Sequence, residues 1–266
     1  MPRPIDGVGR IVAIASGKGG VGKTTVAVNL ALALSLQGAR VGLFDADIYG
    51  PNVPLMLGVR QTHSPRLMMP VARAERMPYL KPLERYGLKV MSIGLLVGDA
   101  DAVMPDPRFA GMLVTQTLQD VIWGDLDYLV IDLPPGTGEP QQSLLRAVKV
   151  DGVVVVTTPQ DLSLLDAGRS LGQFQQAQVP LLGMIENMSY FRCPHCGERI
   201  HVFHQSDGRW PVRDQAAETL GRIPMDIGIS RGIDTGHPLV QATPDAVETA
   251  LFREIAGQIT RKLDAL

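Results

Sequence analysis

The amino-acid sequence predicts an α/β fold, in which a mostly parallel sheet of about seven strands has helices on both faces. Two observations favour this class. Short runs of apolar, β-branched residues recur along the chain, and segments of helix length separate them. The runs are continuously apolar rather than alternating, as expected for strands that are buried on both faces. The predicted strands comprise residues 11–15, 41–44, 88–93, 128–133, 153–157, 181–185 and 220–223.

The bulk composition suits a single domain that spans residues 1–266. Of the 266 residues, 45% are hydrophobic, which is ample for a core, and the net charge of −2 gives no electrostatic case for a nucleic-acid partner. Residues 1–10 lack the apolar segment of a signal peptide, and no apolar run approaches the roughly 20 residues that span a bilayer. We therefore expect a cytoplasmic protein that needs neither membrane nor nucleic acid.

A glycine-rich loop follows the first predicted strand and precedes a helical pattern. Residues 16–25 read S-G-K-G-G-V-G-K-T-T and satisfy the phosphate-loop pattern G-x-x-x-x-G-K-[ST]. Such a loop curls so that its amides converge on an anion at the start of the next helix. We expect Lys23 to reach the outer phosphates and the Thr24 hydroxyl to bind Mg²⁺. A glycine-rich turn that binds nothing is the alternative, and strand, loop and helix in register disfavour it. The predicted nucleotide-binding residues here are Gly17, Lys18, Gly19, Gly20, Val21, Gly22, Lys23, Thr24 and Thr25.

Carboxylates follow two of the predicted strands. Asp45 and Asp47 come directly after residues 41–44, and Asp132 lies at the end of the run 128–133, before a glycine-containing loop. An aspartate at the end of an apolar strand is the Walker B arrangement, which holds Mg²⁺ beside the phosphates. Aspartates at strand ends also cap helices and turns, so the prediction depends on the phosphate loop.

A cysteine pair lies in a predicted insertion at residues 191–198. Cys193 and Cys196 form a C-x-x-C turn that can direct two sulfurs at one metal centre, which is half of a zinc or iron–sulfur site. Three completions are open: the same pair from a second copy of the chain, a zinc site with His201 and His204, or dithiol redox chemistry without metal.

Three further segments carry predictions. Residues 59–87 and 98–111 contain several prolines and are expected to be irregular. A last helix is predicted with Thr243 as its N-cap and Pro244 at its first position. Its apolar face is expected to pack on the core rather than on a membrane. That face consists of Val247, Leu251, Ile255, Ile259 and Leu263.

Several motifs together resemble a known family. The phosphate loop G-K-G-G-V-G-K-T at 17–24 resembles the deviant Walker A loop of the MinD and ParA ATPases. The stretches D-A-D-I-Y-G-P at 45–51, D-L-P-P-G-T-G at 132–138, T-T-P-Q at 157–160 and E-N-M-S at 186–189 are similar to the Mrp/Nbp35/ApbC branch of these P-loop NTPases. The similarity covers almost the whole chain.

The resemblance implies a homodimeric, ATP-binding carrier that delivers a 4Fe–4S cluster to apo-proteins and hydrolyses ATP slowly. It also implies residue roles. Lys18 reaches the partner's nucleotide, Asp47 positions the attacking water, and Asp45 lies near the Mg²⁺. Asn187 reads the adenine, and the Cys193–Cys196 pair shares the cluster with its twin.

Two other functions stay open, and one stretch departs from the family. The alternatives are a MinD/ParA-type spatial-organisation ATPase, which needs no cysteine pair, and a nucleotide-binding module stabilised by zinc. Where the family usually reads W-R-G-P, residues 109–112 read F-A-G-M and lose the arginine. This departure bears on the hydrolysis rate and on contacts near the nucleotide or the dimer interface.

Overall fold

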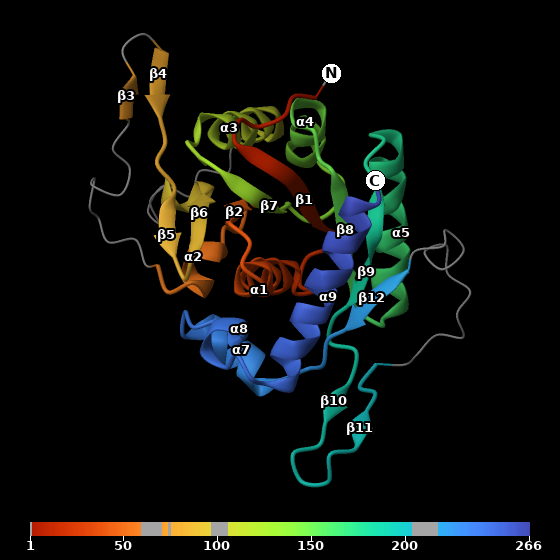
Figure 1. Cartoon of the computed structure of the whole chain (residues 1–266). Coiled ribbons are helices and arrows are strands. Elements are labelled where there is room, and N and C mark those ends of the chain that lie inside the picture. Colours follow the sequence, from red (N-terminus) through yellow and green to blue (C-terminus); the bar gives the residue numbers. More distant parts are fainter. Residues whose placement is uncertain (1, 60–70, 74–75, 97–105, 204–217) are drawn as a thin grey trace.

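A computed structural model describes residues 2–59, 71–73, 76–96, 106–203 and 218–266. Within these residues, eight strands form a central sheet in the order β12-β9-β8-β1-β7-β2-β6-β5, and all neighbours are parallel except β5 and β6 (Figure 1). The strands are β1 (Val8–Ser16), β2 (Val41–Asp45), β5 (Leu83–Arg85), β6 (Leu88–Ser92), β7 (Leu126–Asp132), β8 (Gly152–Thr157), β9 (Leu181–Glu186) and β12 (Thr219–Arg222).

The seven predicted strands are confirmed, and β5 is an addition. It lies inside the stretch 59–87, which the prolines led us to expect as irregular. It has only three residues and pairs antiparallel with β6 at one edge of the sheet. A strand of this kind has no long apolar run, so the apolar pattern does not predict it. The same stretch also holds an antiparallel pair, β3 (Val71–Arg73) with β4 (Arg76–Tyr79), while residues 60–70 and 74–75 lie outside the described part.

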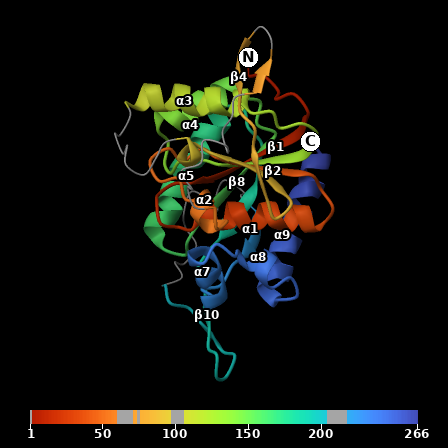
Figure 2. The ribbon, with the colours of Figure 1, turned by 90° about the vertical axis from the view of Figure 1, so that its left-hand side faces the viewer.

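Helices cover both faces of the sheet (Figure 2). One face carries α3 (Pro107–Asp120), α4 (Glu139–Ala147) and α5 (Asp161–Gln176), whose apolar side chains share a core cluster. The other carries α1 (Lys23–Leu36), α2 (Val53–Met56), α7 (Ile227–Asp234), α8 (Leu239–Ala242) and α9 (Val247–Asp264). Helix α1 is buried around most of its circumference because it lies between the sheet and α9.

The predicted start of the last helix is wrong by a few residues. Helix α9 begins at Val247 with Ala246 as N-cap. Thr243 instead ends the preceding helix α8: it is the C-cap of that helix, and its amide and its hydroxyl both donate to the carbonyl of Leu239, at 2.8 and 3.1 Å. Val247 is 67% exposed and does not belong to the buried face, whereas Ile255, Ile259 and Leu263 pack on the core and Leu251 packs at its margin as predicted.

The expected irregular stretch 98–111 is also partly wrong. Helix α3 begins at Pro107, and the Asp106 carboxylate caps it by accepting from the Arg108 amide at 2.9 Å. A proline breaks a helix in its interior, but at the first helical position, where Pro107 lies, its missing N–H costs nothing. Residues 97–105 lie outside the described part.

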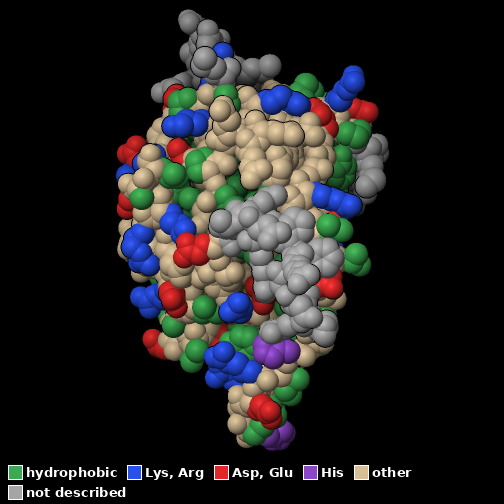
Figure 3. Space-filling model, turned by 90° about the vertical axis from the view of Figure 1, so that its right-hand side faces the viewer, with side chains coloured by type: hydrophobic (Ala, Val, Ile, Leu, Met, Phe, Trp, Pro, Cys, Tyr) green, Lys and Arg blue, Asp and Glu red, His purple; other side chains and the backbone are tan. Residues whose placement is uncertain are grey.

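The cysteine pair belongs to a small hairpin that projects from the body (Figures 1 and 3). Strands β10 (Phe191–Arg192) and β11 (Arg199–Ile200) pair only with each other as a sheet, and a bridge from Phe191 to Met225 joins the hairpin to the body. Among the helices of the described chain, none is long and apolar enough to cross a membrane.

Candidate nucleotide and metal sites

The phosphate loop connects β1 to α1 at the carboxyl edge of the sheet. Gly20 and Gly22 have φ angles of +81° and +82°. Residues that have a Cβ adopt this left-handed backbone region only at a cost in free energy. Gly22 is the N-cap of α1, and its carbonyl accepts the first helical hydrogen bond from Val26. The loop therefore presents backbone amides at the positive end of a buried helix, which is a general binding site for phosphate.

The loop is also pressed against helix α5. A Cβ added at Gly17 would lie 2.1 Å from the backbone carbonyl carbon of Asp166, whereas a Cβ at Gly19 would meet nothing within 4 Å. We expect Gly17→Ala to lower the free energy of unfolding by about 1–3 kcal/mol, because the α5 backbone must move. Gly19→Ala is the matched control and should change it by less than about 0.5 kcal/mol. Urea unfolding of both variants measures the change in free energy. Equal unfolding midpoints for Gly17→Ala and Gly19→Ala would contradict the close packing of the loop on α5.

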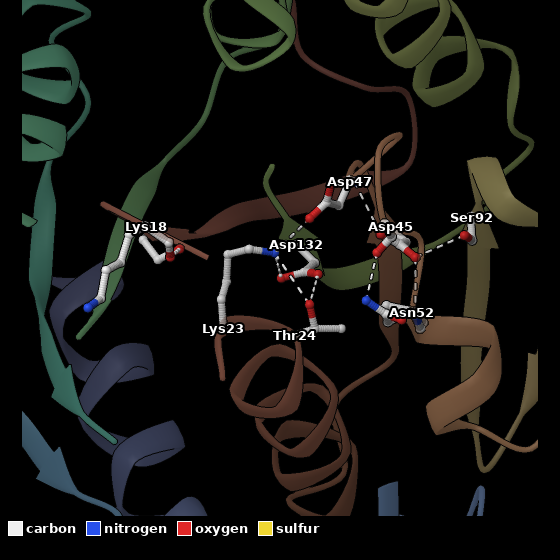
Figure 4. A network of polar contacts seen from close by, with 11 residues as sticks. Lys18, Lys23, Thr24, Asp45, Asp47, Asn52, Ser92 and Asp132 are labelled. Carbon is white, nitrogen blue, oxygen red and sulfur yellow. Dashed lines mark hydrogen bonds and ion pairs between the residues drawn. The ribbon is translucent and has the colours of Figure 1, made fainter. Parts of the chain in front are cut away.

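Lys23, Thr24 and Asp132 form one buried polar network (Figure 4). The Lys23 Nζ lies 2.7 Å from Asp132 Oδ1, and the Thr24 hydroxyl donates to Asp132 Oδ2 at 2.7 Å. The three residues come together because Asp132 ends β7, the strand next to β1, and the loop after β1 carries the other two. The structure thus places the predicted phosphate-loop lysine and magnesium ligands at one point.

Asp45 is held by a different set of partners. It is fully buried, and it accepts from the Ser92 hydroxyl at 2.9 Å and from the amides of Asp47 and Val53 at 3.2 Å. It therefore fixes the loop between β2 and α2. Ser92 is a residue of this site that the sequence motifs do not predict. The only signal was a hydroxyl near the end of the apolar run 88–93.

Three carboxylates share this site with one lysine. The Asp47 carboxylate lies 3.9 Å from Lys23 Nζ, and Asp45 is directly opposite Asp132 in the β2–β7 register. Burial, followed by the charge of Asp132, raises the pKa of Asp45 to about 8. Burial also raises the pKa of Asp47 and of Asp132, and Lys23 opposes the shift in both. Of these groups, the Asp132 carboxylate and the adjoining Thr24 hydroxyl offer hard oxygen atoms that suit Mg²⁺, an ion that usually takes one or two side-chain ligands and fills its other positions with water and phosphate oxygens.

Lys18 points away from this network (Figure 4). Its Nζ lies 3.4 Å from the side-chain oxygen of Gln160, just before α5, and its backbone carbonyl accepts from the Ser16 hydroxyl. The structure therefore does not bring Lys18 to the phosphate position of its own chain.

Asn187, at the end of β9, packs directly on the phosphate loop. Its side-chain amide donates to the Val21 carbonyl at 2.8 Å, and a Cβ at Gly22 would lie 2.2 Å from the same nitrogen. The loop after β7 also reaches the phosphate loop, since the Gly136 amide donates to the Ser16 carbonyl at 3.0 Å. Segments from three strands thus converge on residues 16–22.

The cysteine hairpin forms a tight turn. The Cys193 amide donates to the Glu198 carbonyl, and the Gly197 amide donates to the Cys193 carbonyl, each at 2.9 Å. The backbone amides of Cys196 and His195 stabilise the thiolate of Cys193 and lower its pKa. Both cysteines are free thiols, and no group of three or more metal-binding side chains occurs among the described residues. His204 lies outside that part, so the histidine alternative is untested.

The departure at residues 109–112 lies on the first turns of α3. Phe109 is 51% exposed and Met112 is 55% exposed, while Ala110 and Gly111 are buried. A Cβ at Gly111 would lie 2.6 Å from the Ser143 hydroxyl of α4, so the glycine permits the two helices to pack closely. The stretch therefore presents two apolar side chains to solvent.

Comparisons with known proteins agree with this architecture. The chain is 42% identical to an iron–sulfur cluster carrier protein of Salmonella typhimurium over 259 residues, which cover 97% of this chain and 68% of that protein. A solved nucleotide-binding protein from Archaeoglobus fulgidus, in complex with ADP and with cobalt, is 35% identical with a TM-score of 0.73, covering 90% of this chain and 91% of that one.

A cell-division ATPase and a family model complete the comparison. The cell-division ATPase MinD of Pyrococcus furiosus is 27% identical with a TM-score of 0.68, covering 96% of this chain and 99% of that one. The model of the NUBPL iron-transfer P-loop NTPases, within the ParA group, matches residues 7–260. This chain therefore belongs to the NUBPL iron-transfer P-loop NTPase family.

Proposed function

We propose that this protein is an ATP-dependent carrier that binds a 4Fe–4S cluster and transfers it to apo-proteins. One observation carries the proposal: a built phosphate site and an exposed hairpin with two free thiols occur in the same chain. The relatives named as cluster carriers support it. Because free thiols suit a reducing compartment, we place the protein in the cytoplasm.

The nucleotide site would hold ATP with residues of both the loop and the strand ends. The amides of residues 17–25 and the Lys23 ammonium would bind the phosphates, so Lys23 would exchange its bond to Asp132 for one to a phosphate oxygen. Asn187 would contact the adenine. Thr24 and Asp132 would hold Mg²⁺, since a hydroxyl and a carboxylate already meet there. When bound, the ion supplies positive charge that neutralises the phosphate oxygens.

Hydrolysis in this scheme is slow and needs two copies of the chain. Asp47 lies at the mouth of the site and would orient the attacking water. Lys18 would stabilise the charge on the transferred phosphate of the partner subunit, since in its own chain it points away from the network. The loss of the family's arginine at residues 109–112 is a further reason to expect low turnover.

The cysteines would bind the cluster, which is cargo rather than a fixed part of the protein. A 4Fe–4S cluster normally takes four thiolates, and each copy offers Cys193 and Cys196. Two hairpins that meet in a homodimer would therefore complete one site. The lowered pKa of Cys193 favours the thiolate that binds iron.

Anaerobic reconstitution with iron and sulfide tests this proposal. We expect about four irons per dimer and the broad visible absorption of a 4Fe–4S cluster, and Cys193→Ser should abolish both. Size-exclusion chromatography with light scattering gives the mass of the species that carries iron. Tight binding of one zinc per monomer without cluster uptake would overturn the carrier function and leave a zinc-stabilised module. A spatial-organisation ATPase would leave the cysteine pair without a role.

A further inference from the structure

A cleft of about 690 Å³ lies at the base of the cysteine hairpin. Its walls are formed by residues of the hairpin, of β12 and of the first half of α9. Neither the phosphate loop nor the aspartates of the nucleotide site line it. Figure 3 shows basic side chains and a histidine gathered where the hairpin leaves the body. The cleft is therefore separate from the nucleotide site and lies at the base of the hairpin that carries the two cysteines, neither of which lines it.

One wall of the cleft carries an excess of positive charge. Arg192 and Arg199 are directly opposite each other in the β10–β11 register, an arrangement that destabilises a hairpin unless an anion lies between or beside them. The ring of Tyr190 holds the Arg199 guanidinium at 4.7 Å. Within the described chain, no acidic side chain forms an ion pair with either arginine. Arg222 extends the same wall and lies 3.6 Å from Glu186.

The opposite wall carries negative charge from α9. Glu248 and Glu254 line the cleft, and in the part of the chain that the structure describes neither forms an ion pair. The two hairpin arginines and the two α9 glutamates therefore line the same cleft without forming ion pairs with each other. Opposite charges held apart in this way are complementary to a ligand that carries both signs.

We propose that the cleft binds a short peptide segment of mixed charge, with its carboxylates on the hairpin arginines and its basic groups on the α9 glutamates. Guanidinium groups bind carboxylates in a bidentate geometry, and a preordered pair of them gives orientation as well as affinity. Arg192 is followed directly by Cys193, so the cleft and the sulfur pair belong to the same hairpin, although neither cysteine lines the cleft. That this segment belongs to a protein that receives the cluster rests on the proposed function; the peptide site itself does not.

Fluorescence anisotropy with synthetic peptides tests the site. The probe is a fluorescein-labelled peptide with a glutamate block and a lysine block joined by glycines, and its control has glutamine in place of every charged residue. The full chain should bind the charged peptide and not the control. Arg192→Gln with Arg199→Gln should weaken binding about fivefold to tenfold, and so should Glu248→Gln with Glu254→Gln, because each pair removes two partly exposed ion pairs. Arg231→Gln, an exposed change on α7, should leave binding unchanged.

The outcomes separate this inference from the proposed function. Absence of peptide binding, or equal binding by the wild type and both double variants, would overturn the peptide site. Displacement of the peptide by citrate at lower concentration than by unlabelled peptide would identify a small-anion site and also overturn it. Iron uptake is measured on the same samples and should be unchanged in the α9 double variant. If the wild-type protein binds the peptide but takes up no iron, the carrier function is overturned and the peptide site stands.

Discussion

Replacing Lys18 with alanine should lower ATP turnover by about 10²–10³-fold, while ATP binding stays within about threefold. The reason is the position of the side chain: Lys18 points away from Lys23 and Asp132 and contacts Gln160, so it adds little to the phosphate site of its own chain. In the proposed dimer, the Lys18 ammonium reaches the nucleotide of the partner subunit only after the two copies associate. It should therefore stabilise the transition state of hydrolysis and add little to the affinity of one copy for ATP. Phosphate release and titration with a fluorescent ATP analogue measure the two quantities. Gln160→Ala is the control for the loss of the local contact and should retain turnover.

Mixing two inactive variants tells whether Lys18 acts across the dimer. Lys18→Ala keeps its own Asp47, and Asp47→Asn keeps its own Lys18. In a mixed dimer, the site of the Lys18→Ala subunit has its own Asp47 and receives the partner's intact lysine. Mixing should therefore restore about a quarter of wild-type turnover, because half of the dimers are mixed and each has one complete site. No recovery on mixing, or nearly normal turnover of Lys18→Ala alone, would remove the cross-dimer role.

The free energy of unfolding of Asp45→Asn, measured relative to that of the wild type, should increase as the pH rises. The folded pKa of Asp45, about 8, lies above the ordinary value of 3.8, so folding favours the protonated form. The stability associated with that proton is complete below about pH 4 and is lost as the pH rises toward about 8. Asparagine is neutral throughout and does not suffer this loss. The difference in unfolding free energy between variant and wild type should therefore grow by about 2–5 kcal/mol between about pH 5 and pH 9.

Urea unfolding at several pH values, in buffer with a chelator and no nucleotide, measures this difference. The slope with pH is diagnostic rather than the absolute level. Asparagine also replaces one of the two carboxylate oxygens by an NH₂ group, so either the Asp47 amide or the Val53 amide loses its acceptor. Asp245→Asn, an exposed aspartate outside the site, reports effects common to any such change. A difference curve for Asp45→Asn that is flat, or that falls with pH, would contradict a buried carboxyl that stays protonated near neutrality.

The parts of the fold that follow from local pattern could be predicted from the sequence. Continuous apolar runs gave the seven main strands, and the order of strand, glycine loop and Lys-Thr gave the phosphate loop. The approach of Thr24 to Asp132 could also be anticipated, although 108 residues separate them, because the carboxyl ends of parallel strands lie at one edge of the sheet. In each case the physical cause is periodicity or topology, and both can be read from one chain.

Other features depend on tertiary contacts that no local pattern contains. The hydrogen bond from Ser92 to Asp45 requires β2 and β6 to be neighbours in the sheet, and the residues of these two strands do not determine the strand order. The predicted start of α9 is wrong because Thr243 is the C-cap of the preceding helix α8, a contact with Leu239 that the pattern of the last helix does not contain. The opposed walls of the hairpin cleft come from segments about 50 residues apart that have no motif in common.

The two borders of the central sheet constrain how copies of this chain can associate. One border is β5, with three residues, and the other is β12, with four residues and a register irregularity. Such short borders offer few unpaired backbone groups, which protects a sheet from growing by addition of a strand from another molecule. Assembly of two copies by a continuous intermolecular sheet is therefore disfavoured. A homodimer of the kind proposed above would therefore have to form through helices or loops rather than through a shared sheet.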